Sequence, residues 1–292
     1  MENPKIGFIG LGTMGRGMAD NLKKTYPLCV YNRTRSRAEA LAAAEIAGSP
    51  REAAERSEII FTCVSDDRAL EEILSGSGGL FEADLTGKIL VDSGTTSLGL
   101  TEKIAREAKR KDFEFLDAPV TGSKSGAEEG KLMFMVGGKK EVFDRIVPVL
   151  KTMGERFVYC GRTPNGQSAK HALNLTLSLV LESYLEGLAF GLKAGVPLKA
   201  MEEIFGNSGA KNGIASFKMP YIKKRDFAPH FMLRLMNKDL KLAAEDRARF
   251  GVYAPLADEI IKIFDQALSR GNEDVSTIAK TLEKANGVSF SE

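Results

Sequence analysis

The chain has 292 residues, of which 43% are hydrophobic and 27% charged, as is typical of a globular protein with one large or two medium domains. Its formal net charge of +2 gives no reason to expect binding to nucleic acid or to an anionic membrane surface. The first residues lack the pattern of a signal peptide, and three scattered cysteines with two histidines argue against disulfides or a bound metal. We therefore expect a cytoplasmic protein whose cysteines are small buried side chains.

From residue 5 to about residue 160, short apolar segments alternate with amphipathic ones, which indicates an α/β fold with a doubly wound, mostly parallel, Rossmann-like sheet. The predicted strands are 5–10, 28–32, 59–64, 88–92, 113–117, 132–136 and 156–160. The predicted helices between them are 14–24, 36–44, 51–56, 68–74, 100–111 and 140–152.

After residue 160 the alternation stops, and only helices are predicted, over 166–194, 198–207, 215–224, 236–250, 254–270 and 274–286. We predict a dinucleotide-binding domain over 1–163 and an all-helical substrate and oligomerisation domain over 164–292. The long helix that joins them is apolar on nearly all sides past Leu173. We expect it to be buried in a globular protein and not to span a membrane.

The most informative segment is KIGFIGLGTMG at 5–15, an apolar strand that leads into Gly10, Leu11, Gly12, Thr13, Met14 and Gly15. The Gly-x-Gly-x-x-Gly spacing predicts a strand–turn–helix unit that binds a dinucleotide. The first glycine permits a sharp turn, the second lets the backbone approach a pyrophosphate, and the third lets the helix pack on the strand. The phosphates would then bind the free N–H groups at the helix N-terminus.

The end of the second strand predicts which dinucleotide binds. Proteins that bind NAD or FAD usually have an acidic residue there for the ribose hydroxyls, whereas this chain has Asn32, Arg33 and Thr34. A guanidinium and a hydroxyl suit a 2′-phosphate. The segment therefore predicts NADP (NADPH) as the cofactor and disfavours a flavoprotein.

Two further strand ends carry small polar residues, and ligands of doubly wound sheets bind at the carboxyl ends of the strands. Val64 and Ser65 follow one strand and are predicted to contact the cofactor, whereas we interpret the next residues, Asp66 and Asp67, as helix caps. At Thr95, after the following strand, a ligand contact and a helix cap are equally consistent with the sequence.

The segment FLDAPVTGSKSGAEEGKL at 115–132 is predicted to be a strand up to Asp117, followed by a loop of small residues. Thr121, Gly122 and Ser123 offer hydroxyls and backbone N–H groups without bulky side chains. Such a loop can form an anion-binding concavity for a substrate carboxylate. The alternative is a flexible loop that binds no ligand.

Lys170 and Asn174 lie four residues apart near the start of the long helix, so they share one helical face. A partly buried lysine there could exchange a proton near neutral pH, and the asparagine could bond a substrate oxygen. From the spacing alone, exposed surface residues are the commoner explanation. Lys238 and Asp239, on the helix at 236–250, are equally ambiguous in isolation.

In these segments the chain resembles the β-hydroxyacid dehydrogenase family, which includes 3-hydroxyisobutyrate dehydrogenase and the glyoxylate/succinic semialdehyde reductases. The resemblance covers essentially the whole chain, with GFIGLGTMG, DAPVTGSKSGAEEGKL, GQSAKHALN and NKDLKLA in the family's order. Two departures stand out. The sequence TGSK at 121–124 replaces the Ser-Gly-Gly of many members and looks closest to the glyoxylate/succinic semialdehyde branch, and the turn NGQSA before Lys170 is more polar than the usual form.

The resemblance also implies roles for individual residues. Lys170 matches the family's general acid/base, and Thr95 matches the threonine near the nicotinamide ribose. The substrate residues fall on Asn174, Lys238 and 121–123, and Lys238 is also expected to reach the cofactor.

The implied activity is NADP-dependent hydride transfer with a small β-hydroxyacid or the matching semialdehyde, in the glyoxylate, succinic semialdehyde, 3-hydroxyisobutyrate or L-serine class. The implied assembly is a homodimer or homotetramer. The alternative is a non-catalytic dinucleotide-binding relative, against which the presence of Lys170 and Asn174 speaks.

Overall fold

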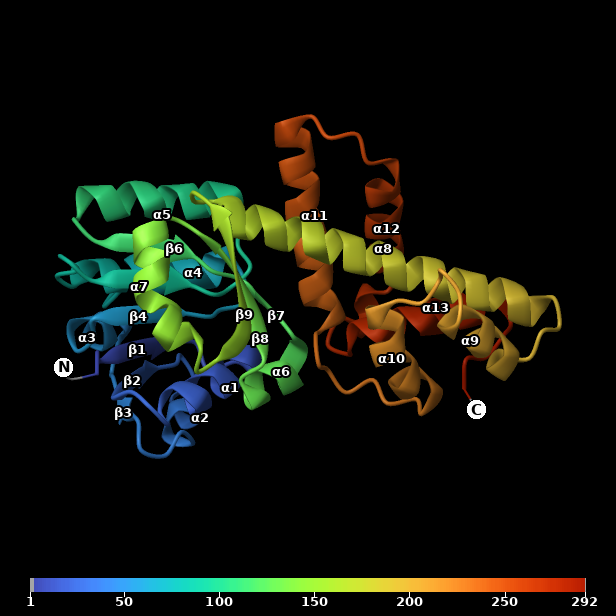
Figure 1. The fold of residues 1–292 in the computed structure, drawn as a ribbon, viewed down its shortest axis with the longest axis horizontal. Coiled ribbons are helices and arrows are strands. Elements are labelled where there is room, and N and C mark those ends of the chain that lie inside the picture. Colours follow the sequence, from blue (N-terminus) through green and yellow to red (C-terminus); the bar gives the residue numbers. More distant parts are fainter. Residues whose placement is uncertain (1–2, 292) are drawn as a thin grey trace. The chain divides into compact units, whose positions relative to one another are not determined.

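The computed structural model describes residues 3–291 and divides into two compact units, the first ending at Lys170 and the second beginning at His171 (Figure 1). The first unit holds one sheet, made of β1 (Ile6–Ile9), β2 (Leu28–Tyr31), β3 (Glu45–Ile46), β4 (Ile59–Thr62), β5 (Ile89–Asp92), β6 (Glu114–Asp117), β7 (Val120–Thr121), β8 (Leu132–Gly137) and β9 (Gly154–Gly161). Its helices are α1 (Thr13–Leu22), α2 (Arg35–Glu39), α3 (Pro50–Glu55), α4 (Asp67–Ser75), α5 (Leu98–Arg110), α6 (Ser123–Glu129) and α7 (Lys140–Leu150), with a 3-10 turn, η1 (Leu80–Glu82).

The strands lie in the order β3-β2-β1-β4-β5-β6-β8-β7, and β9 pairs with β8. All pairs are parallel except β6 with β8 and β7 with β8. The predicted mostly parallel, doubly wound sheet is therefore confirmed. The chain reverses its direction of travel across the sheet at β1, which lies between β2 and β4, and ligands of such sheets bind outside the strand ends at that point.

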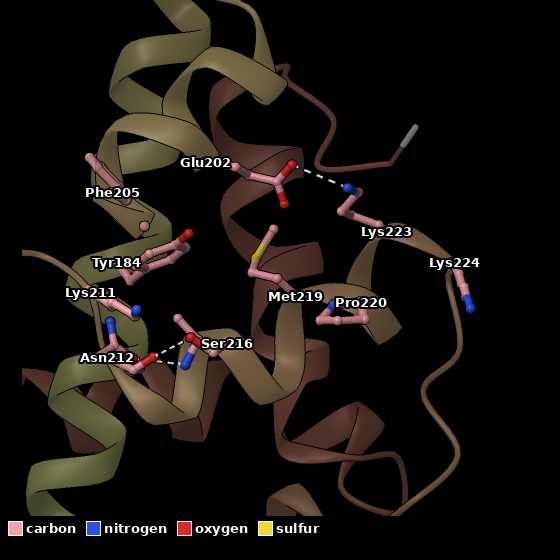
Figure 2. Close-up of a pocket in the computed structure, with 12 residues that line it drawn as sticks. Tyr184, Glu202, Phe205, Lys211, Asn212, Ser216, Met219, Pro220, Lys223 and Lys224 are labelled. Atoms are coloured by element: carbon pink, nitrogen blue, oxygen red, sulfur yellow. Dashed lines mark hydrogen bonds and ion pairs between the residues drawn. The ribbon is translucent and has the colours of Figure 1, made fainter. Parts of the chain in front are cut away.

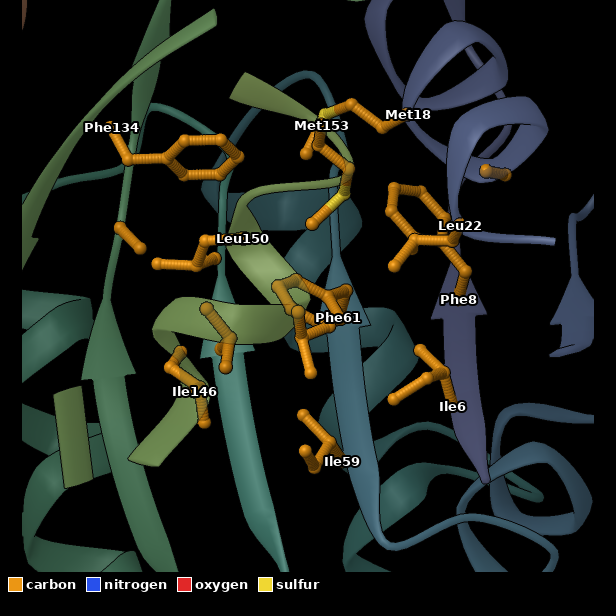
Figure 3. Close-up of a cluster of buried hydrophobic side chains, with 14 of the residues drawn as sticks. Ile6, Phe8, Met18, Leu22, Ile59, Phe61, Phe134, Ile146, Leu150 and Met153 are labelled. Carbon is orange, nitrogen blue, oxygen red and sulfur yellow. The ribbon is translucent and has the colours of Figure 1, made fainter. Parts of the chain in front are cut away.

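The core of the first unit has two layers because both faces of the sheet are covered. Ile6 and Phe8 point to one face, where they pack with residues of α1 and α7 such as Met18 and Leu150 (Figure 3). Ile9 belongs to the opposite layer, with residues of α3, α4 and α5. This burial on both faces explains why the strands are continuous apolar runs.

Two predictions for the first unit were wrong in detail. The helix predicted over 36–44 ends at Glu39, and Ala43 adopts a φ of +64° in the turn that leads to β3. The loop predicted after Asp117 contains the strand β7 and the helix α6. In α6 only Ala127 is buried, so the segment has no apolar periodicity that would predict a helix.

The second unit is entirely helical apart from one isolated bridge, as predicted. The long helix α8 (Asn165–Lys193) begins in the first unit and continues into the second. It is followed by α9 (Leu198–Gly206), α10 (Gly213–Lys223), α11 (Leu233–Phe250), α12 (Pro255–Gln266) and α13 (Ile278–Asn286), with 3-10 turns η2 (Leu268–Arg270) and η3 (Val275–Thr277). Leu181, Leu185, Met236 and Phe264 belong to its core.

Burial of α8 is less complete than its apolar sequence predicts. Only 39% of its most apolar 18-residue window is buried, and Phe190 is 79% exposed. By length and by its mean hydropathy of 1.3 alone, the helix could also span a membrane. Its inner face nevertheless carries buried polar residues, Asn174, Ser178 and Glu182, alongside the leucines of the core.

Candidate active site

The glycine turn after β1 has the geometry that its spacing predicts. Gly10 has a φ of +102°, and a Cβ atom there would lie 2.3 Å from the carbonyl oxygen of Cys63. A Cβ atom on Gly15 would lie 2.0 Å from the carbonyl oxygen of Gly10. Around Gly12, no described atom outside its neighbours lies within 4 Å of the Cβ position, so the backbone there is open to a ligand. The turn therefore fits the pyrophosphate of a dinucleotide.

The end of β2 lies beside this turn. The side chain of Asn32 shapes the turn, because its Oδ1 accepts a hydrogen bond from the N–H of Leu11 at 2.8 Å. Arg33 is exposed, and one of its terminal guanidinium nitrogens lies 3.7 Å from a carboxylate oxygen of Glu72. Thr34 precedes α2 without capping it through its hydroxyl. The guanidinium and this hydroxyl are thus accessible beside the glycine turn.

The residues after β4 lie at the strand end where ligands of such sheets bind, and some of them make hydrogen bonds that hold the neighbouring helices. Asp66 is confirmed as a cap, because its Oδ1 accepts from the N–H of Ala69 at 2.9 Å. The same interpretation of Asp67 was wrong, since its Oδ1 accepts from the N–H of Ser97, at the start of α5. Ser65 donates to Asp66 at 2.7 Å. Val64 is half-buried at the same strand end.

The predicted substrate residues 121–123 form the junction of β7 and α6, since Thr121 ends the strand and Ser123 begins the helix. Gly122 has a φ of +137°, and Ser123 has a φ of +61°, which is uncommon for a residue with a side chain. Left-handed residues outside glycine cluster at functional sites. The segment is held in place because α6 packs closely on α1. The side chain of Asn21 donates to the carbonyl of Ala127 at 2.8 Å, and a Cβ on Gly17 would lie 2.7 Å from the carbonyl carbon of Ala127.

Lys170 and Asn174 are not surface residues. Lys170 is 7% exposed and Asn174 is fully buried, one turn apart on α8. Burying an ammonium group costs free energy that an exposed lysine does not incur. Their spacing in the sequence predicted that they share one helical face, but it could not predict that this face is buried.

Asp239, whose role was ambiguous from the sequence, is hydrogen-bonded to Asn174 in the structure. It is 1% exposed; its Oδ2 accepts from Nδ2 of Asn174 at 2.6 Å, and its Oδ1 lies 2.8 Å from Nζ of Lys238. Among the described residues, Oδ1 of Asn174 has no hydrogen-bond partner. Asn174 therefore offers an acceptor, and one of its two amide N–H groups donates to Asp239. In the sequence, the only indication for Asp239 was its position directly after Lys238 in the segment NKD.

The ionisation of buried acids is shifted in both units. Burial raises the pKa of Asp117 to about 7, while hydrogen bonds from the Gln167 N–H and from Thr163 oppose this shift. Burial, and then the charge of Glu186, raise the pKa of Glu182 to about 7.

The described residues contain neither a disulfide nor a cluster of metal-binding side chains. The three cysteines are unpaired, and burial raises the pKa of Cys29 to about 11 and that of Cys63 to about 12. Cys29 is buried as expected, whereas Cys63 and Cys160 are half-buried. Within residues 3–291 no group of three or more His, Cys, Asp or Glu side chains could hold a metal ion.

A separate pocket of about 330 Å³ lies in the second unit (Figure 2). Tyr184, Phe205 and Met219 contribute apolar surface, and Glu202 pairs with Lys223 at 3.1 Å. None of the predicted site residues lines this pocket.

Comparison with known proteins covers nearly the whole chain. Residues 5–161 match the family model described as the NAD binding domain of 6-phosphogluconate dehydrogenase. Residues 164–282 match the model described as NAD-binding of NADP-dependent 3-hydroxyisobutyrate dehydrogenase.

Individual relatives agree with these matches. The 2-(hydroxymethyl)glutarate dehydrogenase of Eubacterium barkeri is 36% identical over 98% of this chain and 97% of its own length. The 2-hydroxy-3-oxopropionate reductase of Escherichia coli is 34% identical over 96% of this chain and 97% of its own. Among solved structures, 3-hydroxyisobutyrate dehydrogenase of Mycobacterium tuberculosis with L-serine has a TM-score of 0.88 and 26% identity, covering 96% of this chain and 99% of its own.

Proposed function

Since the chain belongs to the β-hydroxyacid dehydrogenase family of oxidoreductases, we propose that it is an NADP-dependent member acting on a small β-hydroxyacid or the matching semialdehyde. The observation that carries the proposal is the burial of Lys170 and Asn174 on one face of α8. When bound, the nicotinamide would accept or supply the hydride. The chain itself would bind and orient the cofactor and the substrate, and it would exchange a proton with the substrate.

The cofactor would be held by the first unit. The backbone at Gly12 and the start of α1 would bind the pyrophosphate, since that backbone is open and the N–H groups there have no helical acceptor. Arg33 and Thr34 would bind a 2′-phosphate, which supports NADP over NAD. Val64, Ser65 and Thr95 would line the cofactor from the ends of β4 and β5.

Lys170 would exchange the substrate proton. In oxidation its neutral amine accepts the hydroxyl proton, and in reduction its ammonium returns a proton to the forming alkoxide. Oδ1 of Asn174 would accept a hydrogen bond from the substrate, while Asp239 fixes its amide orientation. Thr121, Gly122 and Ser123 would bind the substrate carboxylate, and the clamp between α1 and α6 would keep them in place. Lys238, paired with Asp239, would contact both substrate and cofactor.

The names of the relatives support the substrate class. In 2-(hydroxymethyl)glutarate the hydroxyl-bearing carbon is β to a carboxylate, and 2-hydroxy-3-oxopropionate is a semialdehyde of a small acid. Glyoxylate, succinic semialdehyde, 3-hydroxyisobutyrate and L-serine are the other candidates. We also propose a homodimer or homotetramer, supported by the exposed apolar side of α8, and a cytoplasmic location, supported by three unpaired cysteines.

A substrate panel tests the proposal. The purified protein is mixed with β-hydroxyacids and NADP+ or NAD+, and with semialdehydes and NADPH or NADH, and the reduced-nicotinamide absorbance is followed. We expect turnover with at least one β-hydroxyacid or semialdehyde, and a higher kcat/KM with NADP(H). NADPH binding without any turnover would identify a non-catalytic dinucleotide-binding relative instead. Turnover confined to α-hydroxyacids other than glycolate, which is the product of glyoxylate reduction, would contradict the substrate class.

A further inference from the structure

A cluster of buried polar residues lies at the carboxyl ends of β4, β5 and β6 and has no part in the chemistry above. Asp92 ends β5 and is 2% exposed, and Asp117 ends β6 and is fully buried. Oδ1 of Asp92 accepts from the hydroxyl of Thr62 at 2.8 Å, and its Oδ2 accepts from that of Thr96 at 3.2 Å. Buried carboxyl groups are costly unless they are hydrogen-bonded, so this network holds the strand ends in one arrangement.

Gln167 joins this network to α8. Its side chain is fully buried. Its Nε2 donates to the carbonyl of Gly94 at 3.0 Å and lies 3.5 Å from Oδ2 of Asp92, while its Oε1 accepts from the N–H of Thr96 at 3.3 Å. Gly94 and Thr96 flank Thr95, so one amide fixes the backbone on both sides of Thr95.

Asp117 holds the first turn of α8 against the sheet. The N–H of Gln167, which belongs to that turn, donates to Oδ2 of Asp117 at 2.9 Å. A carboxylate in this position acts as a helix cap supplied by another element and is favoured by the helix dipole. The backbone contact is also close, because a Cβ on Gly166 would lie 2.4 Å from the carbonyl oxygen of Asp117 and 2.6 Å from that of Met135.

Lys170 follows Gln167 by three residues on the same helix. We infer that Gln167 is a positioning residue that fixes Lys170 relative to Thr95, while Asp117 holds the turn on which Gln167 stands. The inference rests on the proposed function, because that function gives Lys170 the proton transfer and Thr95 the contact near the nicotinamide. A misplacement of a catalytic group by about 1 Å can lower the rate about 100-fold. The Gln167 amide, which sets the position of Lys170 relative to Thr95, therefore controls kcat.

Gln167→Leu keeps a side chain of similar volume and removes the three side-chain contacts. We expect kcat to fall by about 10- to 100-fold while the Kd for NADPH stays within about threefold, because the glycine turn and Arg33 are untouched. Ser168→Ala is the matched control. It lies next in the same turn, and among residues 3–291 its hydroxyl bonds only the carbonyl of Pro164, so the kcat of this variant should equal that of the wild type.

The deciding measurement repeats Gln167→Leu in a Lys170→Ala background, with enzyme in excess so that slow reaction is measurable. A residue that acts through Lys170 has nothing left to position, so the single Lys170→Ala and the double variant should react within about twofold of each other. If the double variant loses rate by the product of the two single-variant losses, the inference is overturned. A Gln167→Leu protein with wild-type kcat would also overturn it.

The remaining outcomes separate this inference from the proposed function. If Lys170→Ala alone keeps the wild-type kcat, the proposed role of Lys170 fails, and the inference fails with it. If circular dichroism shows that Gln167→Leu is unfolded, Asp117→Asn takes its place, because an amide oxygen still accepts from the Gln167 N–H. A smaller loss, of about 3- to 10-fold, is then expected, and it should again disappear in the Lys170→Ala background. A loss that persists there would overturn the inference.

Discussion

Glu182 gives a stability prediction whose size follows from the structure. Its side chain lies on the inner face of α8, is 4% exposed, and has no hydrogen-bond partner for either carboxylate oxygen among residues 3–291. Burial, and then the charge of Glu186, raise its pKa from 4.5 to about 7. The folded protein therefore binds the proton more tightly than the unfolded chain, and the free energy of unfolding falls as the pH rises from about 4.5 to about 7.

Glu182→Gln removes this titration while keeping the shape of the side chain. One pKa unit corresponds to about 1.4 kcal/mol, so the charged carboxyl should cost about 3 kcal/mol at pH 8 and less than about 1 kcal/mol at pH 5. The free energy of unfolding of the variant, relative to that of the wild type, should therefore rise by about 2 to 3 kcal/mol between pH 5 and pH 8. Glu203→Gln, at an exposed site on α9, is the control and should show no such gain.

Urea unfolding followed by far-ultraviolet circular dichroism at pH 5 and pH 8 measures the effect. Because the chain has two units, the transition that contains α8 must be compared between proteins. A relative rise below about 1 kcal/mol would mean that the Glu182 carboxyl is solvated or paired when charged, contrary to this prediction.

Three further changes test separate parts of the structure. Arg33→Asp should raise the KM for NADP(H) at least about 10-fold and spare NAD(H) in steady-state assays, because a charge-assisted contact to the 2′-phosphate is lost; no change with either cofactor would exclude the clamp. Gly122→Val should abolish turnover while NADPH still binds in a fluorescence titration, and an equal loss of cofactor affinity would indicate damage to the fold. Gly17→Ala should lower the Tm, because its Cβ would lie 2.7 Å from the carbonyl carbon of Ala127. Gly99→Ala, on α5, should leave the Tm unchanged or raised, because its Cβ would come no closer than 4.0 Å to Oγ of Ser97.

The sequence predicts elements well where apolar periodicity is strong. The second strand was predicted over 28–32 and is found at Leu28–Tyr31, and the long helix predicted over 166–194 is found at Asn165–Lys193. The helix α6 could not be predicted because it buries only Ala127. Periodicity reports contact with a core, so a short helix with one buried residue leaves no trace in it.

The candidate site was predictable as a set of segments and not as a set of contacts. The spacing of Lys170 and Asn174 gives a shared face, but their burial depends on residues distant in the sequence. The partner of Asn174 is Asp239, 65 positions away, and Gln167 reaches Thr96 across 71 positions. No local pattern encodes such pairings, so the hydrogen-bond network appears only in the folded chain.

The substitution Lys170→Ala tests most directly whether Lys170 transfers the proton. With the best substrate from the panel, kcat should fall at least about 100-fold, while NADPH affinity stays near that of the wild type. Lys170→Arg should not restore the rate, because a guanidinium stays protonated and cannot accept the hydroxyl proton. The wild-type oxidation rate should decline towards acid pH as Lys170 becomes protonated, and this decline should vanish in the alanine variant. A Lys170→Ala protein with near wild-type kcat and the same decline towards acid pH would show that Lys170 does not transfer the proton.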